Sequence, residues 1–269
     1  MNNSVLAVTD YTNDNDIWFD NKDAYYKAII ENEKDVELEA PDIIVNNKRE
    51  LEVLLLSLGN NVTPIIDTKN EITYRAYKDL FADLNEKNTS ESFEWNYRNP
   101  QEAHNIVTRI SMPDYIRDNL SGDISPISKE YVHKLNQNNV LISYPERFGN
   151  MLYFRGFKEA EELKSDHNSD HLDGIKLFEV VRQSTLASFH VMGVPIGKIM
   201  VLTSTRLDFS KLIELDKPYF VQVIPACKTD GGAMFTAFNV IQEGKSHANG
   251  YIGAYTFRSK EAYQSKRLG

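Results

Sequence analysis

The first half of the chain alternates between two kinds of hydrophobic pattern. Short continuous apolar runs are typical of buried strands, whereas apolar residues at helical spacing indicate amphipathic helices. The runs are Val5–Val8, Ile43–Val45 and Val62–Ile66, and the helical stretches are Asp23–Glu31, Lys48–Leu58 and Glu71–Leu84. Strands that alternate with helices favour parallel pairing, because each crossover helix covers a face of the sheet. We therefore expect a small α/β domain over residues 1–88.

The second half has one long apolar helix among many short extended runs. The helix covers about residues 174–192. The extended runs are Asn139–Ser143, Leu152–Phe157, Lys198–Leu207, Pro218–Ala226, Ala233–Gln242 and Gly250–Phe257. Turn-forming residues such as Asp230-Gly231-Gly232 favour antiparallel hairpins between such runs. The order predicts an α+β fold over residues 126–269, in which an antiparallel sheet wraps around a central helix.

Residues 89–125, between these two patterns, have the composition of a linker. Hydrophobic periodicity fades there, and the sequence Ser-Gly-Asp-Ile-Ser at its end is typical of turns. Several apolar side chains nevertheless interrupt the polar sequence: Trp95, Tyr97, Ile106, Val107 and Ile110. We therefore expect this linker to pack on the core of a neighbouring domain.

Polar residues stand at the predicted strand ends of the first half, namely Asp10, Asn46 and Asp67. Open parallel sheets bind ligands at this edge. The order of strands and polar residues resembles a receiver domain, with Asn46 where such a domain carries its phosphate-accepting aspartate. The resemblance implies a pseudo-receiver that serves in contacts, and an unrelated structural α/β unit is the alternative. The sequence has no glycine-rich phosphate loop, so it gives no indication of nucleotide binding.

The charge of the chain argues against one class of partner. The sequence contains 30 Lys and Arg against 39 Asp and Glu, a net charge of −9. Binding to a phosphate backbone needs a basic surface, so we expect no nucleic-acid partner. The acidic excess lies in residues 1–125, with 12 basic and 24 acidic side chains, whereas residues 126–269 carry 18 and 15.

Cysteine usage and hydropathy indicate a cytoplasmic protein. A single cysteine, Cys227, cannot form an internal disulfide. The N-terminus has neither the basic nor the long apolar region of a secretion signal, and no apolar run reaches 18 residues. We expect no membrane partner. We also expect no metal, because no Cys/His cluster has zinc spacing.

The long apolar helix carries polar residues on one face. Glu179, Arg182 and Gln183 stand at positions i, i+3 and i+4. Because the residues around them are apolar, a carboxylate in this place must be paired, protonated or catalytic. The plain alternative is an ion pair on the helix surface, worth about 0.3–0.5 kcal/mol.

The loop before this helix is rich in aspartate and histidine. It reads Asp166-His167-Asn168-Ser169-Asp170-His171-Leu172-Asp173-Gly174, with two Asp-His pairs four residues apart. A histidine beside an aspartate can be oriented for proton transfer near neutral pH, and a helix N-terminus stabilises a developing oxyanion. Alternatively, Asp170 or Asp173 only caps the helix.

These residues together look like the motif of the A-factor biosynthesis (AfsA-type) hotdog family. The motif is Asp166-His167-x-x-Asp170-His171-x-x-Gly174, then Glu179, then Arg182-Gln183. Val132-His133-Lys134 and the following Asn139-Val140-Leu141-Ile142 are similar to the opening of the family's repeat, so the resemblance covers about residues 126–260. It implies a hotdog fold in which acyl thioesters bind in a tunnel between paired hotdogs. The implied reaction transfers a β-ketoacyl group from acyl carrier protein to the hydroxyl of dihydroxyacetone phosphate, in butyrolactone-type signal or secondary metabolite synthesis.

The resemblance also implies roles for site residues. In our leading hypothesis Glu179 is the general base, Arg182 binds the phosphate or the thioester carbonyl, and His167 or His171 shuttles a proton. The expected substrate-binding residues are Asp166, Asp170, Gly174 and Gln183. No cofactor is expected, because the phosphopantetheine arrives on the substrate, which is acyl carrier protein or acyl-CoA.

The partner surface is suggested by basic residues near the loop. An acidic carrier protein would suit the charges of Arg147, Arg155, Lys158 and Lys164. These residues could equally form an ordinary solvated surface, which is the plain alternative.

The chain departs from the family pattern in ways that leave other activities open. Asp173, Ile175, Val180 and Ser184 replace the usual residues, and only one repeat is visible where the family normally has two. A single hotdog leaves a sheet edge unpaired, so we expect a homodimer. The alternatives are a dehydratase, whose histidine position is Ser165 here, a thioesterase, or a non-catalytic module that binds an acyl ligand.

Overall fold

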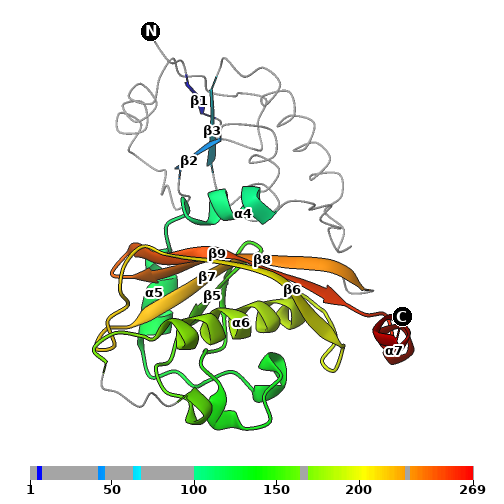
Figure 1. The fold of residues 1–269 in the computed structure, drawn as a ribbon. Helices are drawn as coiled ribbons and strands as arrows, with labels where there is room; N and C mark the ends of the chain where they lie inside the picture. Colours follow the sequence, from blue (N-terminus) through cyan, green and yellow to red (C-terminus); the bar gives the residue numbers. More distant parts are fainter. Residues whose placement is uncertain are drawn as a thin grey trace. The chain divides into compact units, whose positions relative to one another are not determined.

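The computed structural model describes residues 5–7, 42–45, 63–67, 100–163, 169–227 and 231–268. The chain divides into two compact units, Met1–Phe93 and Glu94–Gly269 (Figure 1). The division falls inside the segment 89–125.

Three short strands of the first unit form one sheet. β1 (Val5–Ala7), β2 (Asp42–Val45) and β3 (Thr63–Asp67) coincide with the three apolar runs of the sequence. β3 is central, with β2 parallel and β1 antiparallel to it. The expected all-parallel sheet is therefore wrong for β1, and the order differs from a receiver fold, whose first strand is central and parallel. Strand direction depends on the connections, which apolar runs do not encode. The expected helices, Asp10 and Asn46 lie outside the described residues.

The second unit is built around a six-stranded sheet. The strands follow the order β4-β5-β7-β8-β9-β6, and all neighbours are antiparallel. They are β4 (Glu146–Phe148), β5 (Met151–Arg155), β6 (Met200–Phe209), β7 (Tyr219–Ala226), β8 (Gly232–Gln242) and β9 (Lys245–Thr256). The long helix α6 (Gly174–Val191) runs along the face around which the sheet curves (Figure 1). The expected hotdog arrangement of the C-terminal half is confirmed.

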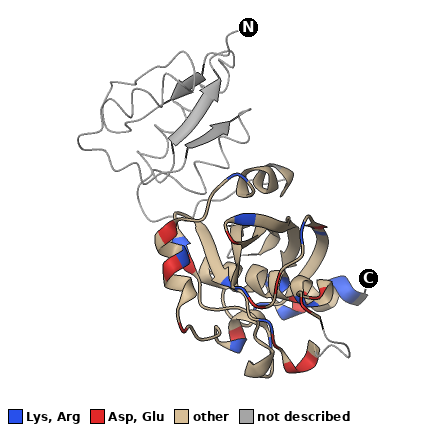
Figure 2. Cartoon of the chain, turned by 90° about the vertical axis from the view of Figure 1, so that its left-hand side faces the viewer, with Lys and Arg blue, Asp and Glu red and all other residues tan. Residues whose placement is uncertain are grey.

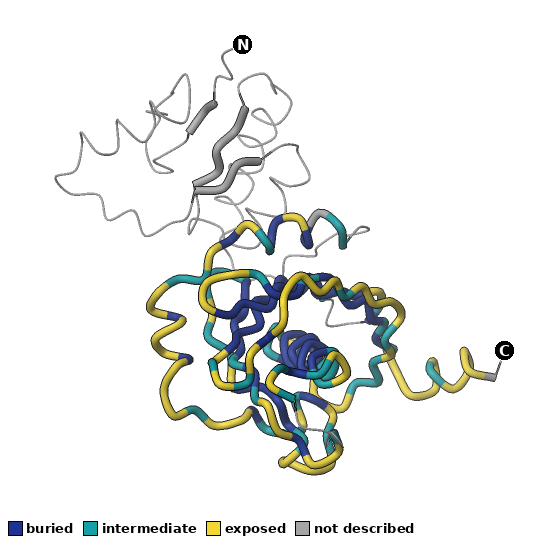
Figure 3. Tube along the Cα trace, turned by 60° about the vertical axis from the view of Figure 1, so that its left-hand side comes forward, coloured by how far each residue is buried: buried dark blue, intermediate teal, exposed yellow. Residues whose placement is uncertain are grey.

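The main core lies between α6 and the sheet. Leu177 and Val181 of α6 pack in one cluster with Val221, Val223 and Val240, and none of these side chains is more than 1% exposed. Alternate residues of each strand point into this cluster, which is the period-two pattern of a sheet with one buried face. Figure 3 shows the buried helix enclosed by the sheet. Burial of the apolar sides of α6 fixes the direction of its polar stripe.

Part of the segment expected to be a linker is helical. α4 (Pro100–Val107) and α5 (Asp114–Ser121) have eight residues each, and a proline starts α4 and precedes α5. Ala103, Ile106 and Val107 are fully buried. α4 contacts β7, β8 and β9 on the face opposite α6 (Figure 1). This part of the segment packs on the core, as expected, but two short helices were hidden by the turn-like composition.

A row of polar side chains crosses the sheet beneath α4. Tyr153, Gln222, Asn239 and Asn249 occupy directly opposed positions on β5, β7, β8 and β9. Gln222 Nε2 donates to Tyr153 Oη at 3.2 Å, Asn239 Nδ2 donates to Gln222 Oε1 at 3.3 Å, and His104 Nε2 of α4 lies 2.7 Å from Asn249 Oδ1. Buried polar groups are costly unless they are paired, so this row favours one docked position of α4.

Irregular segments cover the polar stripe of α6. They contain the 3₁₀ helices η2 (Lys129–Val132), η3 (Gln137–Asn139) and η4 (Glu161–Leu163). The strand expected over residues 139–143 is wrong. Because the backbone bends through η3, only isolated bridges at residues 142 and 143 remain. The described chain ends with α7 (Lys260–Leu268), a helix that the sequence analysis missed.

Candidate functional site

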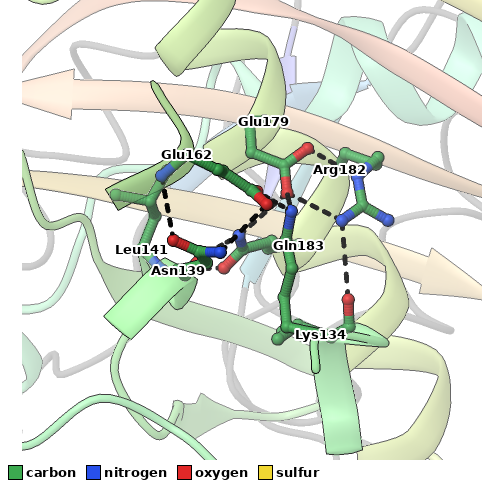
Figure 4. Close-up of polar contacts among 8 residues, drawn as sticks. Lys134, Asn139, Leu141, Glu162, Glu179, Arg182 and Gln183 are labelled. Carbon is green, nitrogen blue, oxygen red and sulfur yellow. Dashed lines mark hydrogen bonds and ion pairs between the residues drawn. The ribbon is translucent and has the colours of Figure 1, made fainter. Parts of the chain in front are cut away.

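The polar stripe of α6 is real, and its first two members form an ion pair. Arg182 Nε lies 2.7 Å from Glu179 Oε2, and Arg182 Nη2 donates to Glu179 Oε1, also at 2.7 Å (Figure 4). The side chains of Glu179 and Arg182 are only 13% and 20% exposed. Two parallel hydrogen bonds from a guanidinium orient it more firmly than a single contact. The pair therefore belongs to a half-buried site, unlike the exposed ion pair considered as the alternative.

Lys134 joins this pair from outside the helix. Its Nζ lies 2.9 Å from Glu179 Oε1 and also forms an ion pair with Glu162 of η4. Only 14% of the Lys134 side chain is exposed. Lys134 belongs to the stretch Val132-His133-Lys134, for which the sequence predicted no chemical role. Nothing in a single sequence relates it to a carboxylate 45 positions away.

The electrostatics of Glu179 are dominated by its donors. Burial alone would raise the pKa of this carboxyl, but hydrogen bonds and charge from Arg182, with further hydrogen bonds from Gln183 and Lys134, lower the pKa to about 2. Glu179 is therefore ionised at neutral pH and holds two cationic side chains beside one another.

Gln183 ties α6 to the segment that covers it. The side chain is fully buried. Its Oε1 accepts from Leu141 N at 2.8 Å, and its Nε2 donates to Asn139 O at 2.8 Å and to Glu179 Oε1 at 2.9 Å. The amide expected to bind substrate is thus occupied by protein partners, and it positions both Glu179 and the covering segment.

Asparagines hold η4 against η3 at the edge of the site. Asn136 and Asn138 donate to Glu161 at 2.7 and 2.8 Å, and Asn139 donates to Glu162 at 3.0 Å. These hydrogen bonds between η3 and η4 form a clamp. The clamp supports Glu162, which in turn contacts Lys134.

A pocket of about 1140 Å³ adjoins this clamp. Its lining combines apolar and polar side chains: Val140, Tyr144, Phe157, Ala160, Leu163, Ser125, Ser128, Gln137, Asn138, Glu159, Glu161 and Lys176 among them. The clamp residues Asn138 and Glu161 line the pocket, and the next residues, Asn139 and Glu162, belong to the Glu179 site. The pocket therefore adjoins the Glu179 site through these neighbouring residues, although Lys134, Glu179 and Arg182 do not line it.

The aspartate-rich loop is only partly described. Asp166 and His167 lie outside the described residues. His171 Nδ1 lies 2.9 Å from Asp170 Oδ1, so the second Asp-His pair forms as the sequence suggests. The hydrogen bond from His171 is the main cause that lowers the pKa of Asp170.

The same part of the loop is fastened to the segment before β7. Backbone hydrogen bonds join Leu172 N to Ile213 O at 2.8 Å and Leu215 N to Asp170 O at 3.1 Å. In the described part of the chain, no hydrogen bond or ion pair links His171 to Glu179 or Arg182.

The start of α6 differs from the capping expectation. Asp173 occupies the N-cap position, yet its side chain makes no capping hydrogen bond, and Lys176 Nζ lies 3.7 Å away from its Oδ2. At Gly174, a Cβ atom would meet the Phe209 ring at 3.5 Å, which is ordinary van der Waals contact. Steric constraint therefore does not explain the glycine.

The comparison with known families covers this whole site. The sequence model of the A-factor biosynthesis hotdog domain matches residues 117–257, more than half of the chain. The chain belongs to this family. The matched A-factor biosynthesis hotdog domain contains α6, all six strands of the sheet and the site residues Lys134, Glu179, Arg182 and Gln183. α4 precedes the matched region, although it packs on the same sheet.

Solved structures show distant likeness to this chain. A hypothetical thioesterase with coenzyme A from Streptococcus pneumoniae is 11% identical, with 40% of this chain and 78% of that chain covered and a TM-score of 0.33. A sigma28-regulated virulence protein from Campylobacter jejuni is 10% identical, with 47% and 91% covered and a TM-score of 0.37. AziG from S. sahachiroi is 16% identical, with 44% and 92% covered and a TM-score of 0.34. No curated protein matches the sequence.

The described residues contain neither a metal-binding cluster nor a membrane-spanning helix. Within those residues, no group of three or more His, Cys, Asp or Glu side chains could hold a metal ion. No helix in the same residues has both the length and the apolar character needed to cross a membrane.

Proposed function

We propose that this protein is an acyltransferase that moves a β-ketoacyl group from a carrier-protein thioester to the hydroxyl of an acceptor like dihydroxyacetone phosphate. The observation that carries the proposal is the Glu179 site, where one ionised carboxylate holds Arg182 and Lys134 side by side in a hotdog domain. Membership of the A-factor biosynthesis hotdog family supports it.

Acyl transfer to a phosphorylated acceptor requires cationic groups at two places, namely the phosphate of the acceptor and the carbonyl oxygen of the thioester. The acceptor oxygen attacks the thioester carbonyl carbon, a C–O bond forms, the C–S bond breaks, and negative charge develops first on the carbonyl oxygen. A guanidinium can bind two oxygens of a phosphate or stabilise an oxyanion. We assign these tasks to Arg182 and Lys134. A carboxylate with a pKa of about 2 is a weak base, so Glu179 positions the two cations instead of taking the proton.

We propose that the thioester arm lies in the 1140 Å³ pocket. Phosphopantetheine has both amide groups and alkyl segments, and the mixed lining of this pocket suits both. The carrier protein is acidic, and α7 carries the basic residues Lys266 and Arg267 in its last turn, where the cartoon of Figure 2 is blue. Arg155 is unsuited to such a partner, because its Nη1 donates to the carbonyls of Ser121 and Gly122 at the end of α5.

Mass spectrometry of the reaction products tests the proposal. The purified protein is incubated with a β-ketoacyl carrier protein, with and without dihydroxyacetone phosphate. We expect an ester that forms only with the acceptor, is lost in Arg182→Gln and persists in Arg117→Gln. Arg117 is the matched control, because it forms an i,i+3 pair with Asp114 on the exposed helix α5.

Other outcomes of the same experiment would contradict acyl transfer. Loss of thioester without acceptor would indicate hydrolysis. Loss of water from a 3-hydroxyacyl substrate whose thioester bond stays intact would indicate dehydration. A thioester that binds and stays intact would indicate a non-catalytic binding module.

A further inference from the structure

Two histidines form a pair on the stripe that carries Glu179 and Arg182. His190 lies near the end of α6, and its Nε2 is 3.0 Å from Nε2 of His133, which follows η2. The ring centroids are 5.2 Å apart. The acyl-transfer steps described above use neither histidine.

The hydrogen bonds of His190 determine which nitrogen carries its proton. His190 Nδ1 lies 2.8 Å from the carbonyl oxygen of Val194, which can only accept. A neutral imidazole has one N–H, so the proton of His190 is on Nδ1 and its Nε2 is an acceptor. His133 must therefore donate from Nε2, which leaves the Nδ1 atom of His133 without a proton and able to take one.

The backbone of His133 is unusual as well. Its φ and ψ angles are 57° and 41°, in the left-handed region, and its N–H donates to Lys129 O. Few residues other than glycine adopt this conformation, and such positions cluster at functional sites. The residue is partly exposed and stands directly before Lys134 in the chain.

Burial and the groups on α6 keep His133 neutral. The charged and titratable groups near it are His190 and Arg182 on α6, Tyr131 on η2, which contacts His190, and Lys134 next in the chain, which pairs with Glu179 and Glu162. Partial burial lowers the pKa of His133 below its ordinary value of 6.5, and His190 and Arg182 lower it further. Burial likewise lowers the pKa of His190. Both rings are therefore neutral at pH 7.

We infer that His133 is the general base of the acyl-transfer site and that His190 is its positioning residue. The inference rests on the proposed function. His133 Nδ1 takes the proton of the acceptor hydroxyl as the oxygen bonds to the thioester carbon. The C–S bond then breaks, and the thiolate leaving group takes that proton back, so the products are an ester and a free thiol. His190 Nε2 accepts from His133 throughout and stabilises the transient imidazolium.

The left-handed backbone of His133 permits a sharp test. Glycine adopts this conformation without strain, so His133→Gly removes the ring and preserves the turn. We expect its kcat to fall about 100-fold or more, with a KM for the thioester close to that of the wild type. Added imidazole should restore part of the lost rate. His104→Gln, on the opposite face of the sheet, should change neither.

The pH dependence separates a base from a structural residue. The wild-type kcat/KM should fall at acidic pH with an apparent pKa below 6.5, and this limb should vanish in His133→Gly. His190→Gln should shift the limb without removing it. A variant His133→Gly that keeps wild-type kcat and the acidic limb would overturn the inference and leave acyl transfer intact.

Nitrogen NMR of labelled histidines provides a readout independent of activity. We expect the Nδ1–H tautomer for His190 and the Nε2–H tautomer for His133 at pH 7. Two rings that titrate independently near pH 6.5 would overturn the pair. A wild-type protein that forms no ester at all would instead contradict the proposed function.

Discussion

Lys134 Nζ lies 2.9 Å from Glu179 Oε1 and joins the segment between η2 and η3 to the middle of α6. The same ammonium group contacts Glu162, so one lysine links two carboxylates from separate elements. The second carboxylate stands at the end of the irregular segment that leads into the aspartate-rich loop. A single side chain thus connects the middle of α6 to η4.

Replacement of Lys134 by Met should weaken the acceptor side of the reaction. Methionine keeps the length and the packing of the stem but removes the charge that we assign to phosphate or oxyanion. We expect kcat/KM for acyl transfer to fall about tenfold or more, by steady-state kinetics with dihydroxyacetone phosphate varied. Lys217→Met, in an exposed pair with Glu214, is the control and should behave as wild type. Equal activity of the two variants would contradict a role for Lys134.

Glu179 should make the fold sensitive to acid. Its pKa is about 2 in the folded chain against an ordinary value of 4.5, so the unfolded chain binds the proton more tightly. The stabilisation is fully present above about pH 4.5 and is lost as the pH falls towards 2, on the order of 3 kcal/mol in total. Urea unfolding between pH 3 and 7 should show this slope, and Glu179→Gln should reduce it. Wild type and variant with the same slope would contradict the assignment.

Gln183 should matter for stability more than for chemistry. Gln183→Leu keeps the volume but leaves Leu141 N–H and Asn139 C=O without their partners in a buried place. We expect a loss of about 1–3 kcal/mol in the free energy of unfolding, measured by urea denaturation. Gln264→Leu on the exposed face of α7 should stay within about 0.5 kcal/mol of wild type. A small effect at position 183 would mean that the covering segment is held by other contacts.

The sequence predicted what depends on local pattern. α6 was found because its apolar residues surround most of the helix, and Glu179, Arg182 and Gln183 share a face because of helical spacing alone. Lys134 and the His133–His190 pair depend on how distant segments meet, which spacing does not encode. The same limit applies to Arg155, which we expected at a partner surface. Its guanidinium donates to carbonyl groups at the end of α5.

Gly250 should be intolerant of any side chain. A Cβ at this position would overlap the carbonyl oxygen of Arg206, because β9 and β6 approach closely there. We expect Gly250→Ala to cost about 1–3 kcal/mol of unfolding free energy, with the β6 edge displaced. Gly122→Ala is the control, since nothing lies within 4 Å of its Cβ position and its φ is −73°. Thermal unfolding measures the stability of both variants. Equal stability of Gly250→Ala and Gly122→Ala would contradict the close approach of β9 and β6.

The free edge of the sheet should mediate self-association. Among the described strands, β6 pairs only with β9, and an edge strand of ten residues offers backbone groups for pairing with a second copy. Near its end, Phe209, Leu212 and Ile175 are 59%, 66% and 75% exposed. These apolar side chains lie beside the start of α6, because the Phe209 ring adjoins Gly174. A twofold axis across β6 would cover the edge and the apolar patch together.

Light scattering should therefore give a mass near twice 30.8 kDa for the wild type. Phe209→Asp places a charge in the patch and should shift the protein towards the monomer, with a dissociation constant raised about tenfold or more, since desolvating an unpaired charge is costly. Leu135→Asp changes an apolar residue that is 96% exposed in the segment between η2 and η3, and should remain dimeric. Because a monomer leaves the β6 edge open on every molecule, the Phe209 variant should also aggregate more readily on heating. A monomeric wild type at micromolar concentration would show that the edge is covered in another way.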